Sequence, residues 1–209
     1  MSRLLDGLRL PIMSEAREIP SETPSETPSE STSEAQEWKR CFIALAPDAP
    51  SRDALAALDV PPNARRVPHA QLHLTVAFIG AMSFAQGEAL AQRLADRATP
   101  LPPAPVTKIE CWPGHAPPRL LVAVLAMSDA FTALDWHVRS SMGEVGLSLD
   151  TRAFRPHVTL ARFARDAHAA PPTGSGAALP TLRFTSLVLY SSMLAKQGAR
   201  YEALASVPV

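Results

Sequence analysis

The sequence predicts an α+β protein whose two halves contain related strands. Short segments of alternating polarity are interspersed with segments whose apolar residues recur at helical spacing, and the turns between them are short. One seven-residue phrase occurs twice, as HLTVAFI from His73 to Ile79 and as HVTLARF from His157 to Phe163. One copy in each half favours two small lobes of related structure in a single chain.

If each phrase is a β-strand, its side chains alternate between the two faces of a sheet. The His and Thr of each copy then share one face, and a sheet that buries its apolar face leaves such polar groups pointing away from the core. Two such strands can direct two histidines and two threonines into one groove. The residues that we expect on the opposite, core-facing side are Leu74, Val76 and Phe78 in the first copy and Val158 and Leu160 in the second.

The residues that flank each motif strengthen this interpretation. A bare H-x-T match is weak, because His and Thr occur two residues apart by chance. Both copies, however, continue with an aliphatic residue, an alanine and further apolar residues, and both follow a proline, Pro68 or Pro156. The structural alternative is two half-buried strands whose His and Thr side chains form only local hydrogen bonds.

The other elements follow from capping residues and periodicity. Ser51 is expected to cap a helix, Gly80 to end the first repeat strand, and Ser83 with Gln86 to form a capping box. A loop rich in Pro, Gly and Ser is expected over 170–180. The expected strands cover 41–46, 72–79, 106–111, 120–125, 156–163, 182–190 and 200–206, and the expected helices cover 51–58, 83–98 and 128–146.

The N-terminal segment has the composition of a disordered tail. Residues 14–37 read SEAREIPSETPSETPSESTSEAQE, in which the unit SETP repeats and almost no residue is apolar. Such a segment cannot bury enough surface to offset the entropy of ordering. We therefore predict a disordered tail over 1–37 and a single domain over 38–209. A passive extension is the simpler reading, and docking controlled by phosphorylation is the functional alternative.

Composition limits the classes of function. With 20 Lys and Arg against 20 Asp and Glu, the formal charge is zero. This balance argues against coating of long duplexes but allows a small anionic ligand held by a few arginines. Cys41 and Cys111 are too few for a disulfide framework, which favours a reducing compartment. Because no stretch approaches the roughly 18 apolar residues of a membrane span and no signal-peptide core is present, we expect a soluble, cytoplasmic protein without membrane contacts.

Two histidines that face one site can cleave a phosphodiester. One imidazole removes a proton from the nucleophile while the other protonates the leaving oxygen. Because free histidine has a pKa of about 6.5, both protonation states are present near neutral pH, and no metal or cofactor is required. A threonine hydroxyl on the same face can donate to a non-bridging phosphoryl oxygen as charge grows there.

Four features resemble the 2H phosphoesterase superfamily: the pair HLTV and HVTL, the early strand RCFIAL, the run FRPHVTLARF and the terminal GARYEAL. Within this superfamily, residues 38–206 are similar to the bacterial RNA 2',3'-cyclic phosphodiesterases, the 2'-5' RNA ligase-like family. The resemblance implies a bilobal fold of two antiparallel sheets related by a pseudo-two-fold axis, with outer helices and a central groove.

The same resemblance implies a role for each motif residue. His73 is expected to donate a proton to the leaving 3' oxygen, and His157 to accept a proton from water. Thr75 and Thr159 are expected to bind the phosphate. Arg162 follows its motif as in relatives and is a candidate substrate contact.

Some positions depart from the family pattern or receive no catalytic role. Relatives often carry an aromatic residue where this chain has Arg66, and a Trp in the strand that 120–123 occupies here, which leaves base stacking in question. Zinc at Cys111 and His115 lacks a second pair of ligands. Structural or surface roles are expected for Arg119, Arg155, His69, His115, His137 and His168.

The predicted reaction opens a 2',3'-cyclic phosphate at an RNA end to a 2'-phosphomonoester without metal. RNA ends or cyclic nucleotides are the expected partners, and we expect a monomer. One alternative is 2'-5' RNA ligation by the same residues, since a catalyst of one direction also catalyses the reverse. The other is a non-catalytic nucleotide- or RNA-binding module, which retention of both His-Thr pairs argues against.

Overall fold

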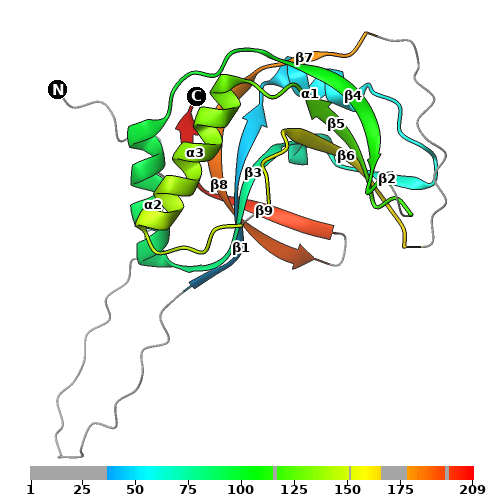
Figure 1. Cartoon of the computed structure of the whole chain (residues 1–209). Coiled ribbons are helices and arrows are strands. Elements are labelled where there is room, and N and C mark those ends of the chain that lie inside the picture. The colour runs from blue at the N-terminus through cyan, green and yellow to red at the C-terminus, as the bar shows by residue number, and fades with distance from the viewer. Residues whose placement is uncertain (1–36, 115–116, 151, 166–177, 196–197) are drawn as a thin grey trace, which may run out of the picture.

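The structure, a computed structural model, describes residues 37–114, 117–150, 152–165, 178–195 and 198–209. The predicted tail, apart from Glu37, lies outside the described residues, as do His115, His168 and residues 170–177 of the predicted loop. The elements of the described part are β1 (Glu37–Pro47), α1 (Ala49–Ala56), β2 (Ala64–Arg66), the 3-10 helix η1 (His69–Gln71), β3 (Leu74–Ser83), α2 (Phe84–Arg97), β4 (Ala104–Trp112), β5 (Leu120–Leu125), α3 (Asp129–Glu144), β6 (His157–Phe163), β7 (Thr181–Leu182), β8 (Phe184–Ala195) and β9 (Gly198–Pro208) (Figure 1).

The strands form two antiparallel sets that meet at one point. The order is β7-β4-β5-β6-β3-β1-β8-β9, with β2 also paired to β6. The two motif strands, β3 and β6, are joined only by the pair Leu74 and Val158. Because the ladder stops there, the two sets diverge (Figure 1). This arrangement confirms the predicted α+β fold with two antiparallel sheets.

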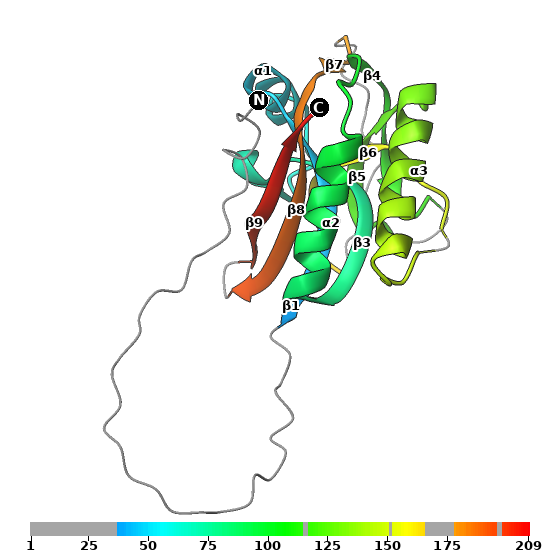
Figure 2. The same cartoon turned by 90° about the vertical axis from the view of Figure 1, so that its left-hand side faces the viewer.

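The helices and the core join the two sets into one body. Helix α2 packs against β3 and β9, α3 packs against α2 and β3, and both views show these two helices side by side (Figures 1 and 2). One continuous apolar cluster includes Ile43 and Leu74 from one set and Leu121 and Val158 from the other, all fully buried. None of the described helices is long and apolar enough to cross a membrane.

The helix starts follow local hydrogen bonding. The Ser83–Gln86 capping box is confirmed, and so is the Ser128 cap of α3. The predicted Ser51 cap of α1 is wrong: the Asp48 carboxylate accepts from the Ser51 backbone N–H at 2.8 Å, and the helix begins at Ala49, two residues earlier than predicted. The Ser51 hydroxyl instead accepts from the backbone N–H of Arg183 at 2.8 Å.

Strand β3 extends beyond the predicted end. Gly80 adopts a φ of 89° within the strand, which remains paired with β1 to Ser83 across a register shift after Gly80. Glycine favours both strand ends and irregular backbone within a strand, so the sequence alone predicted that the strand ends at Gly80. The three shortest elements, β2, η1 and β7, were not predicted, because two or three residues carry no detectable periodicity.

Candidate active site

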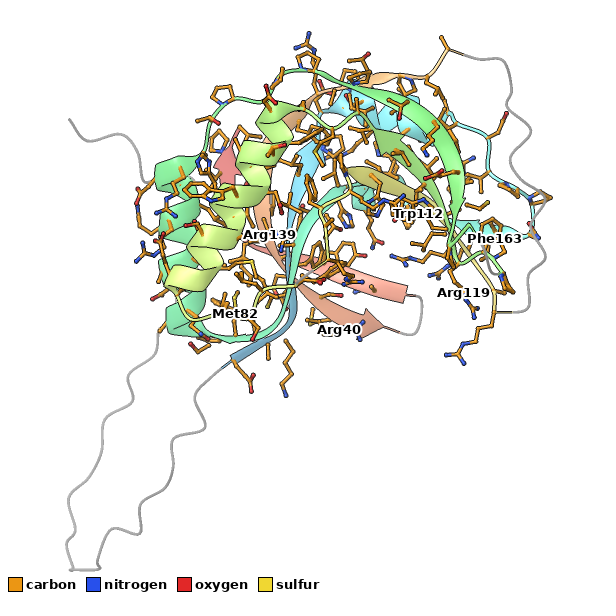
Figure 3. The ribbon with its side chains drawn as sticks, viewed as in Figure 1. Arg40, Met82, Trp112, Arg119, Arg139 and Phe163 are labelled. Carbon is orange, nitrogen blue, oxygen red and sulfur yellow. The ribbon has the colours of Figure 1, made fainter. Side chains whose placement is uncertain are left out.

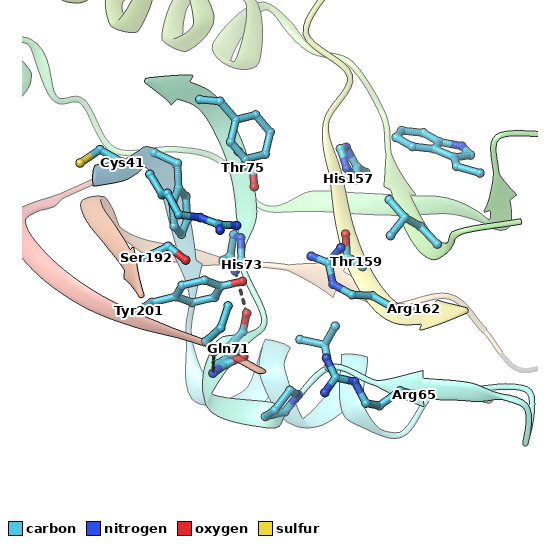
Figure 4. Close-up of a pocket in the computed structure, with 18 of the residues that line it drawn as sticks. Cys41, Arg65, Gln71, His73, Thr75, His157, Thr159, Arg162, Ser192 and Tyr201 are labelled. Atoms are coloured by element: carbon cyan, nitrogen blue, oxygen red, sulfur yellow. Dashed lines mark hydrogen bonds between the residues drawn. The ribbon is translucent and has the colours of Figure 1, made fainter. Parts of the chain in front are cut away.

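The four motif residues converge where the two sheets meet. In the antiparallel register set by Leu74 and Val158, His73 lies across from Thr159 and Thr75 lies across from His157. All four line one cavity of about 610 Å³ (Figure 4). The cavity wall therefore alternates histidine and threonine around a common centre, as the two phrases predict.

Both motif strands contain a β-bulge at the same position. In β3, Thr75 and Ala77 pair with adjacent residues of β1, so one extra residue, Val76, lies between them. In β6, Thr159 and Ala161 pair with adjacent residues of β5 in the same way. Each extra residue comes three positions after the motif histidine. This repeated irregularity is direct structural support for the pseudo-two-fold relation of the halves.

The bulges decide which later side chains reach the cavity. Phe78 and Arg162 each follow their histidine by five positions, and both line the cavity and are exposed. The expectation that Phe78 is a core residue is wrong: it is 59% exposed, because the bulge reverses the alternation after Thr75. Val76 stays buried, as predicted. Arg162 reaches the cavity by the same reversal.

The two imidazoles are oriented by equivalent hydrogen bonds. His73 Nδ1 donates to the carbonyl oxygen of Gln71 at 2.7 Å, and His157 Nδ1 donates to that of Arg155, also at 2.7 Å. Because a carbonyl only accepts, Nδ1 carries the proton in both rings, which leaves Nε2 to exchange protons with a ligand. Gln71 is held in turn by its amide, which donates to the Ala199 carbonyl at 2.9 Å.

The threonine hydroxyls have no competing partner. Within the described residues, no hydrogen bond engages the hydroxyl of Thr75 or Thr159, although both side chains are half-buried. This weighs against the alternative in which the motifs only satisfy local hydrogen bonds. Two hydroxyls and two Nε2 atoms without protein partners among the described residues can all form hydrogen bonds with a polar ligand.

His73 lies in an aromatic environment. Its ring contacts Phe42 at a centroid distance of 5.3 Å and Tyr201 at 5.4 Å in an edge-on arrangement. Burial lowers the pKa of His73, and the charges of Arg162 and His157 lower it further, whereas the hydrogen bond to Gln71 opposes the shift. In the absence of a ligand, the neutral form of His73 is therefore favoured.

His157 lies beside an aromatic ring and a cation. Its imidazole centroid is 4.4 Å from that of Trp112, and the Arg155 guanidinium lies 4.0 Å above the Trp112 ring. Burial lowers the pKa of His157, the Arg155 charge adds to this shift, and the hydrogen bond to the Arg155 carbonyl opposes it. Glu110 accepts from the Trp112 indole at 2.6 Å and fixes the ring.

The cavity is lined by cations. Five arginines and no carboxylate line it: Arg40, Arg65, Arg66, Arg152 and Arg162. The zero net charge hides this, because residues 37–209 contain 17 Lys and Arg against 13 Asp and Glu, while the tail is acidic. A positive, partly desolvated cavity suits an anion such as a phosphodiester.

Several cavity residues were missed by sequence reasoning. Trp112 pairs across strands with Leu120, within the segment where relatives often carry a Trp. Phe78 could have been found from an alignment of the two phrases, in which it occupies the same position as Arg162, a candidate substrate contact. Arg40, Gln71 and Tyr201 gave no comparable signal, because their positions depend on tertiary structure. Figure 3 labels Arg40 on the half formed by β1 and Trp112 on the half formed by β4.

The remaining candidates lie outside the site. His69 pairs with Asp53 at 2.9 Å on the surface, and His137 lies on α3 beside Trp136. Arg119 does not line the cavity, and Arg155 contacts it through Trp112. Among the described residues, no group of three or more His, Cys, Asp or Glu side chains could hold a metal ion.

Comparison with known proteins agrees with this geometry. The model of the 2'-5' RNA ligase superfamily matches residues 31–186. The chain is 32% identical over 182 residues to the RNA 2',3'-cyclic phosphodiesterase of Escherichia coli K12, covering 80% of this chain and 95% of that protein. Among solved structures, E. coli LigT complexed with 3'-AMP superposes with a TM-score of 0.65 at 26% identity, covering 82% and 98% of the two chains. A protein of Thermus thermophilus gives a TM-score of 0.67 at 25% identity, covering 81% and 97%. The chain therefore belongs to the 2'-5' RNA ligase superfamily, the 2H phosphoesterases, and is a hydrolase that acts on phosphodiester bonds.

Proposed function

We propose that this enzyme hydrolyses the 2',3'-cyclic phosphate at an RNA end, or of a cyclic nucleotide, to a 2'-phosphomonoester without a metal ion. The observation that carries the proposal is the alternation of two free Nε2 atoms and two free threonine hydroxyls around one arginine-lined cavity. This set contains a proton acceptor, a proton donor and two donors for phosphoryl oxygens, so every group that the displacement needs is a side chain.

The proposed step is an in-line attack by water. Neutral His157 accepts a proton at Nε2 as the water oxygen bonds to phosphorus. The bond from phosphorus to the 3' oxygen breaks, and protonated His73 donates from Nε2 to that oxygen. Thr75 and Thr159 donate to the non-bridging oxygens, where charge increases in the transition state. The products are a 2'-phosphomonoester and a free 3'-hydroxyl.

The lowered pKa values fit this scheme when the substrate charge is included. A low pKa keeps His157 neutral and ready to accept a proton. His73 must instead be protonated, which burial disfavours in the free enzyme. A phosphodiester anion bound between the rings raises the pKa of both, because an opposite charge nearby stabilises the imidazolium. Substrate binding therefore assists protonation of the general acid.

Hydrolysis is favoured over ligation as the main reaction. The E. coli relative is named a phosphodiesterase, and E. coli LigT forms a complex with 3'-AMP, a mononucleotide that carries no second RNA end. Ligation would use the same residues in reverse and would require a second RNA end in place of water. Phe78 adds an exposed aromatic surface at the cavity wall on which a nucleobase can stack.

The decisive experiment is hydrolysis of adenosine 2',3'-cyclic phosphate by the full chain, with the product identified by chromatography. We expect 2'-AMP, with turnover that survives EDTA. His137→Ala, a histidine variant remote from the cavity, serves as the matched control and should behave as the parent. A 3'-AMP product would reverse the leaving group assigned to His73, and inhibition by EDTA that zinc or magnesium relieves would refute the two-histidine scheme.

A further inference from the structure

Arg40 is a cation of the cavity that has no role in the proposed mechanism. Arg40 lines the cavity from β1, and its backbone φ is 55°. This is the left-handed region, which L residues other than Gly, Asn and Asp seldom adopt. Among the described residues, Arg40 is the one non-glycine with a positive φ. A backbone that favours glycine therefore carries a long cationic side chain.

A bulge in β1 produces this conformation. Between the cross-strand pairs on either side, two residues of β1, Lys39 and Arg40, oppose a single residue of β3. The bulge is anchored by the buried Ser191, whose hydroxyl donates to the Lys39 carbonyl at 3.2 Å. Residues held in such conformations by their surroundings cluster at ligand-binding sites.

The Arg40 charge is uncompensated in the described part of the chain. No carboxylate there pairs with its guanidinium, and the side chain is exposed. Other arginines of the cavity are committed: Arg66 donates to two backbone carbonyls, and Arg152 pairs with Asp150. An exposed guanidinium in a cavity without carboxylates has its donors free for an anion.

Arg40 and Arg162 enter the cavity from different sheets. Arg162 lies on β6, five residues after His157. Arg40 lies on β1, two residues before Phe42, whose ring centroid is 5.3 Å from that of His73. Both arginines line the cavity, which therefore receives one cation from each of the two motif-bearing sheets.

We propose that Arg40 binds the 5'-phosphate of the nucleotide whose 2',3'-cyclic phosphate is opened, and so favours RNA ends over cyclic mononucleotides. This inference rests on the proposed function. The terminal nucleotide of an RNA carries both anions on one ribose, the cyclic phosphate on one side and the 5'-phosphate on the other. One cation from each sheet suits two anions on one ribose, and a guanidinium binds phosphate through two parallel hydrogen bonds.

The test compares two substrates, adenosine 2',3'-cyclic phosphate with and without a 5'-phosphate, using the full chain. In the parent, the 5'-phosphate should raise kcat/KM by about 10-fold or more, and this gain should shrink as salt rises. Arg40→Gly removes the guanidinium and suits the positive φ, so the gain should fall to about 2-fold or less while the melting temperature is maintained. Lys39→Ala, the matched control in the same bulge, should keep the parental gain.

The inference is overturned by no gain from the 5'-phosphate in the parent, or by a full gain in Arg40→Gly. An equal loss on both substrates with a lower melting temperature would assign Arg40 a structural role and also overturn it. If Arg40→Gly fails to fold, Arg40→Gln gives the same comparison with the length of the side chain retained. Failure of the proposed function is separate, because the parent would then release no 2'-AMP from the substrate without a 5'-phosphate.

Discussion

The two halves of the cavity share a backbone plan and differ in their side chains. In each, the histidine Nδ1 is held by the carbonyl two residues earlier, and a bulge three residues after the histidine turns the fifth residue into the cavity. His73 lies beside Phe42 and Tyr201, whereas His157 lies beside Trp112, on which the Arg155 guanidinium stacks. The residue five positions after the histidine is Phe78 in one half and Arg162 in the other.

The repeated backbone and the differing side chains have separate roles in the site. The repeated backbone positions two equivalent Nε2 atoms and two hydroxyls, which is a geometric requirement of the reaction. At the position five residues after the histidine, the halves differ in chemistry: Phe78 provides an aromatic surface and Arg162 a cation. In the proposed reaction, the symmetric groups act on the phosphate, and the asymmetric side chains distinguish the two ends of the substrate.

The largest expected effect is loss of either histidine. His73→Ala and His157→Ala should each lower kcat by about 10²-fold to 10⁴-fold, because solvent must then supply the missing proton transfer. The double variant should be little worse than either single variant, since acid and base act in one displacement. Rates with adenosine 2',3'-cyclic phosphate, on variants with unchanged circular dichroism, provide the measurement.

A sulfur leaving group distinguishes the acid from the base. A thiolate leaves with little need for protonation, so a cyclic substrate with sulfur at the 3' position should restore most of the rate of His73→Ala but not of His157→Ala. Rescue of His157→Ala alone would exchange the two roles. Parental rates in both folded variants would show that the twin motif is structural.

The threonines should have the next largest effect, and a similar one in both halves. Thr75→Ala or Thr159→Ala removes one donor to the phosphoryl group, which should lower kcat by up to about 10²-fold to 10³-fold. Thr→Ser at either position keeps the hydroxyl and should restore much of the rate. A large loss at one threonine and none at the other would show that the phosphate lies off the pseudo-two-fold axis.

Substitution of Phe78 or Arg162, the residues five positions after the histidines, should change KM more than kcat. Phe78→Ala should raise KM for substrates that carry a base, since stacking on an aromatic side chain contributes about 1–3 kcal/mol. It should not raise KM for ribose 2',3'-cyclic phosphate, which has no base. Arg162→Ala should weaken both substrates alike, because the phosphate is common to them. Equal effects of Phe78→Ala on both substrates would contradict the assigned stacking role.

The smallest expected effect is a shift in the pH dependence of kcat/KM. Because the pKa of each histidine is lowered in the free protein, both limbs of the kcat/KM profile should fall below about 6.5, the ordinary histidine value. The acidic limb reports protonation of the base, and the alkaline limb reports loss of the acid proton. In kcat, which reports the bound state, both limbs should move to higher pH, since the substrate anion stabilises the imidazolium. A kcat/KM profile that only rises with pH would exclude a histidine acid.

Sequence reasoning found the motif residues because periodicity and repetition are local properties. It placed Phe78 in the core because strict alternation was assumed beyond Thr75, and a bulge leaves no mark in the sequence. It ended β3 at Gly80 for a related reason: a positive φ within a ladder and a turn both favour glycine. These errors concern backbone irregularities that only cross-strand pairing reveals.

The electrostatics of the site were also hidden from the sequence. A formal charge of zero gave no sign of five arginines around one cavity, because the acidic tail offsets the basic remainder of the chain. Proximity between Trp112 and His157 likewise depends on the register of β4, β5 and β6. Long-range pairing decides such contacts, and single-sequence patterns do not report it.

The single pair that joins β3 to β6 has a mechanical consequence. A pivot moves least at its own centre, and the catalytic groups flank the pair Leu74 and Val158. Any change in the angle between the two sheets would therefore displace residues remote from this pair more than the histidines beside it. The pair thus fixes the dimensions of the reaction centre more firmly than those of the cavity rim.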